Sequence, residues 1–278
     1  GLVGKNIGAI YDSYAEITIN GGWRTAGLIG LNVGLVKNSY SKGSIISWGD
    51  FVGGLVGVNS NQIDSCYSTC SVQADYTVGG LVGFNTGSIK LSYAIGNVTG
   101  DGTVGGLVGE HDSSVSAILE NCYSRGNVTS GSGAGGLTAI NENNIQNCYS
   151  TGTVTKIGSY GGLIGDDGSS DEGVATFSYW DTQTSGISAS YGGEGKTTVL
   201  MKTASTYNSW DFSTIWGING IDNDGYPYLR WQGFSLVKPV LSAISISSIT
   251  RNTAILTFNS DSAGTYYYLV YSPEDSAP

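Results

Sequence analysis

The side chains best suited to chemistry lie in two acidic segments. One is Glu110-His111-Asp112, and the other runs from Asp166 to Glu172. Clustered carboxylates act as acid and base in glycoside hydrolases, and carboxylate oxygens bind calcium. Neither segment has the position-by-position pattern of a known calcium loop. Three interpretations stay open: solvated acidic turns, a calcium site, or the carboxylate pair of an enzyme.

A third acidic segment resembles the start of an EF-hand calcium loop. It begins at Asp222 with the letters DNDG, but the glutamate needed at position 12 is absent, and residues 231–233 occupy that region. We expect no cofactor, and calcium is the one metal for which the sequence offers candidate ligands. These candidates are Asp166, Asp171, Glu172, Asp222 and Asp224.

His111 is the single histidine of the chain. A zinc protease needs two histidines at helix spacing with a glutamate, and a serine triad also needs a histidine. One histidine excludes the first reaction within this chain, and no Gly-x-Ser-x-Gly elbow supports the second. We therefore predict a hydrogen-bonding structural role for His111, no catalytic residue, and a protein that is not an enzyme.

These segments belong to a repeat. Gly-Leu-Val/Ile-Gly starts at residues 1, 27, 54, 80, 106 and 162, and a degenerate copy starts at residue 136. A tyrosine follows each start by 13 or 17 residues. The tyrosines are Tyr14, Tyr40, Tyr67, Tyr93, Tyr123, Tyr149 and Tyr179. The period defines seven copies over residues 1–179.

Each copy holds three short apolar segments separated by Gly, Ser and Asn, and no window has helical periodicity. Three strands in 26 residues are typical of one coil of a right-handed parallel β-helix, in which equivalent residues stack about 4.8 Å apart. We predict an all-β solenoid of about seven coils. Unbroken alternation from Ile63 would point Tyr67 inward, whereas a bend at Ser65 would point it outward.

A polar column stands five residues after each leading glycine. Stacked amides hydrogen-bond along the axis and satisfy the backbone of a turn. We therefore predict a structural ladder at this turn. Its members are Asn6, Asn32, Asn59, Asn85, His111, Asn141 and Asp167.

The period ends after Tyr179. Residues 180–232 hold four of the six tryptophans and predict a cap over the open end of the β-helix, with an aromatic sugar platform as the alternative. One short helix is expected over residues 197–207, with Thr197 or Thr198 as N-cap.

Residues 233–239 indicate a linker. Residues 240–278 predict the start of an incomplete β-sandwich, with strands at 241–249, 253–258 and 265–271. We expect a fragment of a longer protein.

Composition narrows the partners. Glycine supplies 44 of 278 residues, which predicts tight, side-chain-free contacts between coils, and charged residues make up 12 %. A net charge of -10 argues against nucleic acid, because no basic surplus is present to displace counterions. No apolar run approaches the ~18 residues of a membrane span.

Cys66, Cys122 and Cys148 share one column, where parallel Cβ vectors suit a disulfide poorly, so buried free thiols are favoured.

The Gly-Leu-x-Gly anchor, with Asn-Cys-Tyr-Ser-Thr-Gly-x-Val, resembles the GLUG-motif repeats of bacterial cell-surface proteins. Residues 80–85 and 147–154 carry the clearest likeness, and residues 179–229 resemble the ending that often follows such repeats. Thr138-Ala139 and Cys70 depart from the pattern. GLUG repeats occur in adhesins and in non-catalytic parts of IgA-cleaving metalloproteases. The tail from Val240 resembles immunoglobulin- or fibronectin-like modules.

The resemblance implies a non-enzymatic extracellular segment at the bacterial cell surface or cell wall, acting as a rigid spacer or ligand-presenting rod in adhesion. The alternatives are a polysaccharide-active β-helix enzyme, either lyase or hydrolase, and a non-catalytic region of a secreted protease. The expected partner is a host, cell-surface or glycan ligand. Self-association through coil ends or the incomplete tail is a further expectation, whereas nucleic-acid binding and membrane insertion are not expected.

Overall fold

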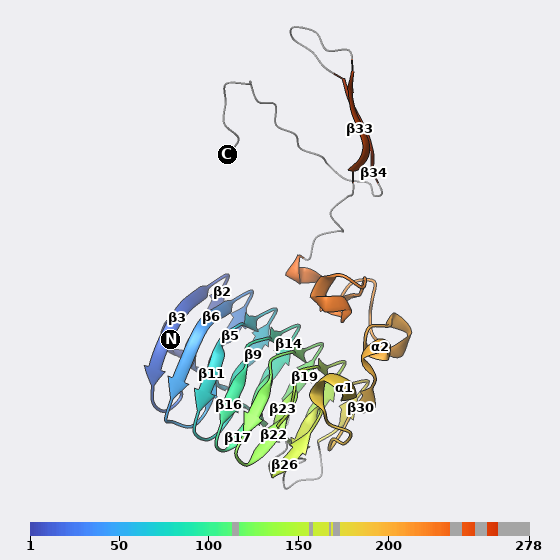
Figure 1. Ribbon diagram of the computed structural model, residues 1–278. Coiled ribbons are helices and arrows are strands. Elements are labelled where there is room, and N and C mark those ends of the chain that lie inside the picture. Colours follow the sequence, from blue (N-terminus) through green and yellow to red (C-terminus); the bar gives the residue numbers. More distant parts are fainter. Residues whose placement is uncertain are drawn as a thin grey trace. The chain divides into compact units, whose positions relative to one another are not determined.

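The computed structural model describes residues 1–112, 117–155, 158–166, 168, 173–233, 241–247 and 255–260 (Figure 1). The chain divides into two compact units, Gly1–Gln232 and Gly233–Pro278. In the second unit, β33 (Leu241–Ser247) pairs antiparallel with β34 (Ile255–Ser260), at the places predicted for the first two strands of the tail. The predicted third strand lies outside the described residues.

The first unit is a parallel β-solenoid, as predicted. One sheet contains the second half of each Gly-Leu-Val-Gly motif and runs through seven coils in parallel register. Its strands are β1 (Val3–Asn6), β4 (Ile29–Asn32), β8 (Val56–Asn59), β13 (Val82–Asn85), β18 (Val108–His111), β23 (Thr138–Asn141) and β27 (Ile164–Asp166).

A second seven-stranded parallel sheet follows the asparagine turn. Its central residues, such as Ile63 and Ile89, point into the core. Its strands are β2 (Ala9–Tyr11), β5 (Leu35–Lys37), β9 (Gln62–Asp64), β14 (Ser88–Lys90), β19 (Ile118–Glu120), β24 (Asn144–Gln146) and β28 (Ala175–Thr176).

The third sheet contains the strands that begin at the repeated tyrosines. Two long strands, β3 (Tyr14–Gly21) and β6 (Tyr40–Ser47), start it. In the third to fifth coils, the chain bends after the tyrosine strand and a separate strand follows. The tyrosine strands are β10 (Tyr67–Ser68), β15 (Tyr93–Ala94), β20 (Tyr123–Ser124), β25 (Tyr149–Ser150) and β29 (Tyr179–Asp181), and those after the bend are β11 (Ser71–Ala74), β16 (Val98–Gly100) and β21 (Val128–Ser130).

A fourth, five-stranded sheet completes the coils. Its strands are β7 (Val52–Gly53), β12 (Val78–Gly79), β17 (Thr103–Gly105), β22 (Gly133–Gly135) and β26 (Ser159–Gly161). The first coil therefore has the three predicted strands, whereas the second to sixth coils have four or five short strands, so the prediction of three was wrong for those coils. The difference arises because glycines and bends break the apolar segments into shorter pieces than the pattern of apolar residues indicates.

The core fills with stacked aliphatic side chains, with Leu55, Leu81 and Leu107 fully buried in successive coils. Backbones approach one another closely beside this stack. A Cβ atom on Gly80 would lie 2.1 Å from the carbonyl oxygen of Gly106 in the next coil. No side chain fits there, so the glycine excess follows from coil-to-coil contact.

The direction of the tyrosines is decided by a bend. Ser65 has a φ of 53°, and its equivalents two residues before each tyrosine lie between 46° and 54°. This left-handed residue interrupts the alternation of side chains along the chain. Ile63 and Cys66 consequently stay in the core, while Tyr67 packs outside it.

Residues 180–196 close the last coil. The Trp180 side chain packs in the core, its indole nitrogen donates to the Ile187 carbonyl (3.1 Å), and β30 (Glu194–Lys196) pairs with β29. The short helix α1 (Thr182–Ser185) begins at Asp181, whose carboxylate accepts from two backbone amides. This part of the segment acts as the predicted cap.

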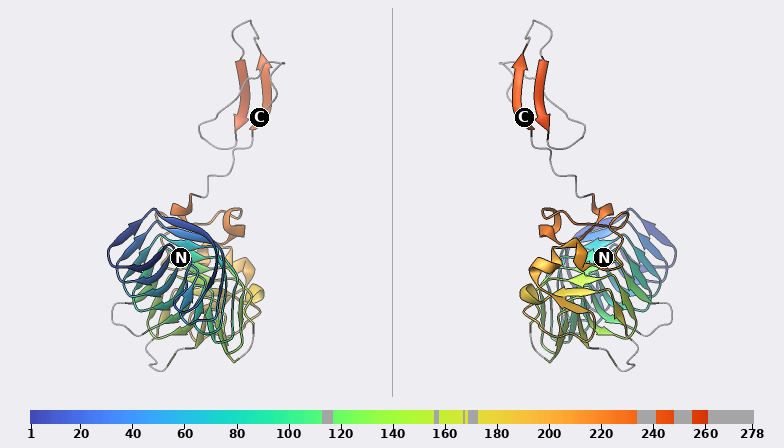
Figure 2. Two further views of the ribbon diagram at one scale, coloured as in Figure 1. Left: turned by 90° about the vertical axis from the view of Figure 1, so that its left-hand side faces the viewer. Right: turned by 90° about the vertical axis from the view of Figure 1, so that its right-hand side faces the viewer.

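Residues 197–232, here called the covering segment, lie along one side of the coils (Figure 2). Its helix α2 (Thr198–Met201) begins at Thr197, whose hydroxyl accepts from the Leu200 amide, as predicted. The predicted helix 197–207 is shorter and continues as the turn η1 (Ala204–Thr206). The remaining elements are β31 (Trp216–Gly217), η2 (Asp222–Gly225), β32 (Tyr228–Leu229) and η3 (Arg230–Gln232).

Candidate functional site

The predicted asparagine ladder is present in the first four coils. Asn6 donates to the side-chain oxygen of Asn32 (2.8 Å), Asn32 to Asn59 (2.8 Å) and Asn59 to Asn85 (2.7 Å). Each amide also bonds the residue two positions on, as Asn32 does with the carbonyl (2.8 Å) and N–H (3.2 Å) of Gly34. The ladder thus satisfies the turn backbone and links neighbouring coils.

His111 takes the next position of the ladder. The Asn85 amide nitrogen lies 3.0 Å from His111 Nδ1, an arrangement that makes Nδ1 the acceptor and assigns the ring proton to Nε2. Burial lowers the pKa of His111 to about 4, so the ring is neutral at pH 7. It is fully buried and faces the ladder, which suits the predicted structural role.

The ladder changes after His111. Asn141 pairs with His111 in the backbone register, and its amide donates to the Asn143 carbonyl (2.8 Å). Among the described residues, His111 Nε2 and Asn141 Oδ1 are buried without a hydrogen-bond partner. The amide-to-amide chain is therefore interrupted at this point. Asp167, the seventh predicted member, lies outside the described residues.

Six tyrosines form a continuous stack outside the core. Neighbouring ring centroids from Tyr14 to Tyr149 are 4.7 to 5.0 Å apart, and the rings are within 11° of parallel. Because the rings stand in equivalent positions of adjacent coils, the stack follows directly from the repeat. Tyr14 is 58 % exposed, whereas Tyr123 and Tyr149 are buried.

The covering segment buries the later part of this stack. Trp216 packs on both Tyr123 and Tyr149, with ring centroids 6.3 and 6.1 Å apart, and Tyr226 lies against Tyr149 at 6.4 Å. Burial raises the pKa of Tyr93 to about 12, and it raises the pKa values of Tyr123 and Tyr149 well above the ordinary value. These hydroxyls stay protonated at neutral pH.

Hydrogen bonds fasten the segment coil by coil. Three of its indole nitrogens donate to the coils. Trp210 donates to the Phe177 carbonyl (2.8 Å), Trp216 to Asn121 Oδ1 (3.0 Å) and Trp231 to the Leu91 carbonyl (2.9 Å). Tyr149 donates to the Pro227 carbonyl (2.6 Å), and Gln232 donates to the Tyr123 hydroxyl (2.8 Å). The segment runs back from the last coil to the fourth, so it braces the side of the solenoid as well as its end.

Arg125 joins the coils to the segment by charge. Its guanidinium donates to the Asn223 carbonyl (3.0 Å), pairs with Asp224 (2.6 Å) and lies 5.0 Å above the Tyr226 ring. Hydrogen bonding from Arg125, with its charge, lowers the pKa of Asp224. Asp222 accepts from Asn219 (2.6 Å). Asp224 and Asp222, two of the predicted calcium ligands, are thus bonded to other side chains of the protein.

The other acidic candidates lie on the outer side of the first sheet. Glu110 is in register with Ile140, which is in register with Asp166, so the two carboxylates are two coils, or about 10 Å, apart. Burial, then the charges of Asp112, Glu142 and Asp50, raise the pKa of Glu110. Asp171 and Glu172 lie outside the described residues.

The described residues contain no group of three or more His, Cys, Asp or Glu side chains that could hold a metal ion. No helix within the same described ranges is long and apolar enough to cross a membrane.

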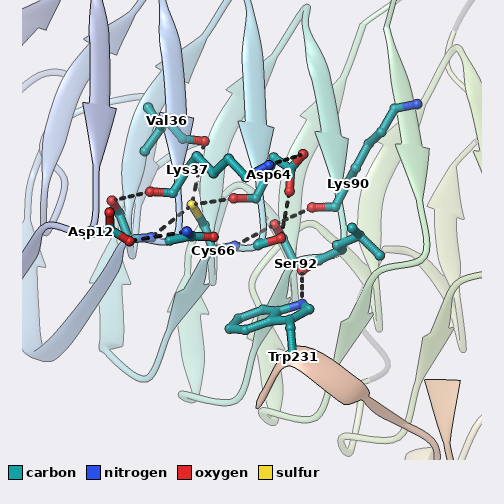
Figure 3. A network of polar contacts seen from close by, with 12 residues as sticks. Asp12, Val36, Lys37, Asp64, Cys66, Lys90, Ser92 and Trp231 are labelled. Carbon is teal, nitrogen blue, oxygen red and sulfur yellow. Dashed lines mark hydrogen bonds and ion pairs between the residues drawn. The ribbon is translucent and has the colours of Figure 1, made fainter. Parts of the chain in front are cut away.

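The four cysteines are free and buried, as the spacing predicted for the three in one column. Cys66 lies below the surface between Val36 and Asp64, with its sulfur 3.2 Å from the Asp64 carbonyl, while Trp231 closes over the neighbouring coil (Figure 3). Burial raises the pKa of the Cys66 thiol to about 12. A thiol of this kind is a poor nucleophile, so the column is structural.

No family model matches this chain, and a search of curated proteins finds no match.

Proposed function

We propose that this chain is a non-enzymatic, stiff segment of an extracellular bacterial surface protein, which spaces or presents other parts of that protein. The tyrosine stack braced by the covering segment is the observation that carries the proposal. It adds a second, lateral fastening to coils that already share parallel sheets and an asparagine ladder. The resemblance to GLUG-motif repeats supports the surface location.

A rod of this kind resists deformation only if its coils are held together. In a solenoid each repeat contacts its neighbours only, so coils can separate one at a time. Here the covering segment spans several coils through Trp231, Gln232, Trp216 and Trp210. Separating two of these coils therefore also requires breaking aromatic and hydrogen-bonded contacts outside the sheets. Such a rod transmits force without lengthening.

Single-molecule pulling of the full chain tests this role. We expect the solenoid to resist extension until it opens cooperatively, because the covering segment links the coils. Stepwise unravelling of coils 4 to 7 at low force would contradict the proposal. Surface location is tested on cells that produce the protein, where a protease added outside should cleave it; protection in intact cells would count against this part.

A polysaccharide-active enzyme remains the second candidate, and Glu110 is the observation that favours it. A carboxyl with a raised pKa can act as a general acid, and Asp166 lies in the same column. The wild-type chain and a Glu110→Gln variant should be incubated with neutral and acidic polysaccharides. Products formed by the wild type and lost in the variant would establish this activity and overturn the structural proposal.

A further inference from the structure

A shallow groove lies away from the tyrosine stack, where the third sheet turns into the fourth. It is lined by side chains of the second, third and fourth coils, among them Ile46, Trp48, Gln73, Asp75 and Asp101. Trp48 is 63 % exposed and Tyr76, at the same turn, is 57 % exposed. Large exposed aromatic side chains gathered at one place mark a binding surface more often than an ordinary surface does.

The repeat aligns these groups in two rows. Ile46 is in register with Gln73, and Gln73 with Thr99, so these side chains follow one another along the axis. Asp101 and Asp75 are also neighbours, because the Asp101 amide donates to the Asp75 carbonyl (3.1 Å). An apolar group at one end thus continues into a polar row with a spacing of about 4.8 Å.

The polar groups of the groove are available to a ligand. Within the described residues, the side chains of Gln73, Asp75, Thr99 and Asp101 make no hydrogen bond or ion pair, and the Trp48 ring stacks on no other aromatic ring. The indole packs against Gly22 of the preceding coil. A Cβ atom added to Gly22 would lie 3.5 Å from the indole nitrogen. The site is therefore an oriented ring beside unpartnered hydrogen-bonding groups.

Charge and size restrict what can bind there. Two carboxylates on a chain of net charge -10 repel nucleic acids and acidic polysaccharides. A protein partner covers about 20 to 30 residues on each side, more than this groove offers. A sugar ring matches it, since it has an apolar face for the indole, hydroxyls for carboxylate and amide groups, and a length close to the coil spacing.

We propose that this groove binds a neutral oligosaccharide, with one sugar ring on Trp48 and the next hydroxyls bonded to Gln73, Asp75 and Asp101. The binding site goes beyond the structural role proposed above, and the rod would stand without it. The ligand would lie along the coil axis. The sequence contained a signal at Trp48, because the equivalent positions of neighbouring copies are Gly22, Asp75 and Asp101.

The test is titration of the full chain with cellohexaose, mannohexaose and chitohexaose as neutral probes and hexagalacturonate as the acidic probe. We expect at least one neutral probe to bind with a Kd of about 1 mM or tighter. Trp48→Ala should weaken that binding by about tenfold or more, since it removes the stacking surface, and Asp101→Asn should weaken it less. Tyr160→Ala, which removes an exposed aromatic ring outside the groove, is the control.

Three results would overturn the assignment. They are no binding of any neutral probe, tighter binding of hexagalacturonate than of the neutral probes, and neutral binding that Trp48→Ala leaves unchanged. A thermal melt of each variant shows that it folds, and the exposure of Trp48 predicts a Tm close to that of the wild type. None of these results alters the pulling experiment, so the two proposals fail separately.

Discussion

Two columns run along the coils, and they differ in what completes them. The asparagine ladder lies within the turns and is satisfied by its own neighbours and by the backbone two residues on. The tyrosine stack lies outside the core and is exposed at Tyr14 but buried at Tyr149. The repeat places both columns equally well. Of the two columns, only the ladder is complete without the covering segment, and it is so in the first four coils.

The repeat determines where each tyrosine of the stack lies, but it does not determine how far that tyrosine is buried. Equivalent tyrosines have almost the same ring spacing throughout the stack, yet their burial is decided by a non-repeating segment far along the chain. The stability lost on removing a tyrosine should therefore vary with the coil. The stability lost on removing a ladder asparagine should be about the same in each coil where the ladder is intact.

The largest effect is expected from Tyr149→Ala. It removes a fully buried ring, its bond to the Pro227 carbonyl and the bond it accepts from Asn223 (2.8 Å). Loss of a buried aromatic side chain costs about 3–5 kcal/mol. Tyr14→Ala removes an exposed member of the same stack and should cost less than about 1 kcal/mol. Denaturant unfolding followed by circular dichroism measures both; equal losses would show that the covering segment does not stabilise the stack.

The second effect concerns acid stability through His111. Above pH 6.5 the ring is neutral in both folded and unfolded states. Between pH 6.5 and about 4 the unfolded chain binds a proton that the folded chain does not, so stability falls with falling pH, by about 3 kcal/mol over the interval. His111→Asn restores the amide of the other coils and should remove this contribution. Unfolding curves at pH 7 and pH 4 test it, and an unchanged difference between them would contradict it.

Much of the solenoid could be predicted because period, tyrosine column and asparagine column coincide in the sequence. The bend that points Tyr67 outward was recognised only as one of two possibilities, since Ser65 is not a residue type that requires a positive φ. The pattern of apolar residues also does not predict the number of strands in a coil. Breaks at single glycines leave the apolar segments intact in the sequence while ending the hydrogen-bonded pairing.

The candidate site was harder to predict. Asn85 and His111 could be placed by counting, because a ladder depends on neighbours one period apart. Arg125 and Asn223 are 98 residues apart and share no period, so nothing local indicated their contact. The aromatic richness of residues 180–232 predicted burial but not the surface they bury. Contacts between a repeat and a unique segment depend on how that segment folds back.

The third effect is a break in the ladder. Asn59→Ala removes the acceptor of the Asn32 amide and the group that bonds the backbone of Asn61 (3.0 Å to its carbonyl). Each buried polar group left unpaired costs about 1–3 kcal/mol, so a total of about 2 kcal/mol is expected. Asn32→Ala should cost a similar amount, because both lie in intact coils. A much smaller cost in either variant would show that water replaces the ladder.

The smallest effect tests how charge fastens the covering segment. Arg125→Met keeps the apolar stem of the side chain but removes the pair with Asp224, the bonds to the carbonyl and side-chain oxygens of Asn223, and the contact with the Tyr226 ring. Because Asp224 is largely exposed, solvent screens the ion pair, and we expect about 1–2 kcal/mol from these contacts together. Hydrogen exchange should quicken first at the amides of residues 222–229.

Lys42→Met is the matched control for Arg125→Met. Lys42 also lies over a tyrosine ring, that of Tyr40 in the stack, at 4.9 Å, and is paired at 3.9 Å with Glu16. Its ion pair and its ring contact both lie within the first two coils, and both charged side chains are exposed, so its loss should cost about 0.5 kcal/mol or less. If both variants lose the same stability, cation–ring contacts stabilise the stack everywhere and the covering segment adds no ionic fastening. A larger loss at Arg125 assigns the difference to the segment itself.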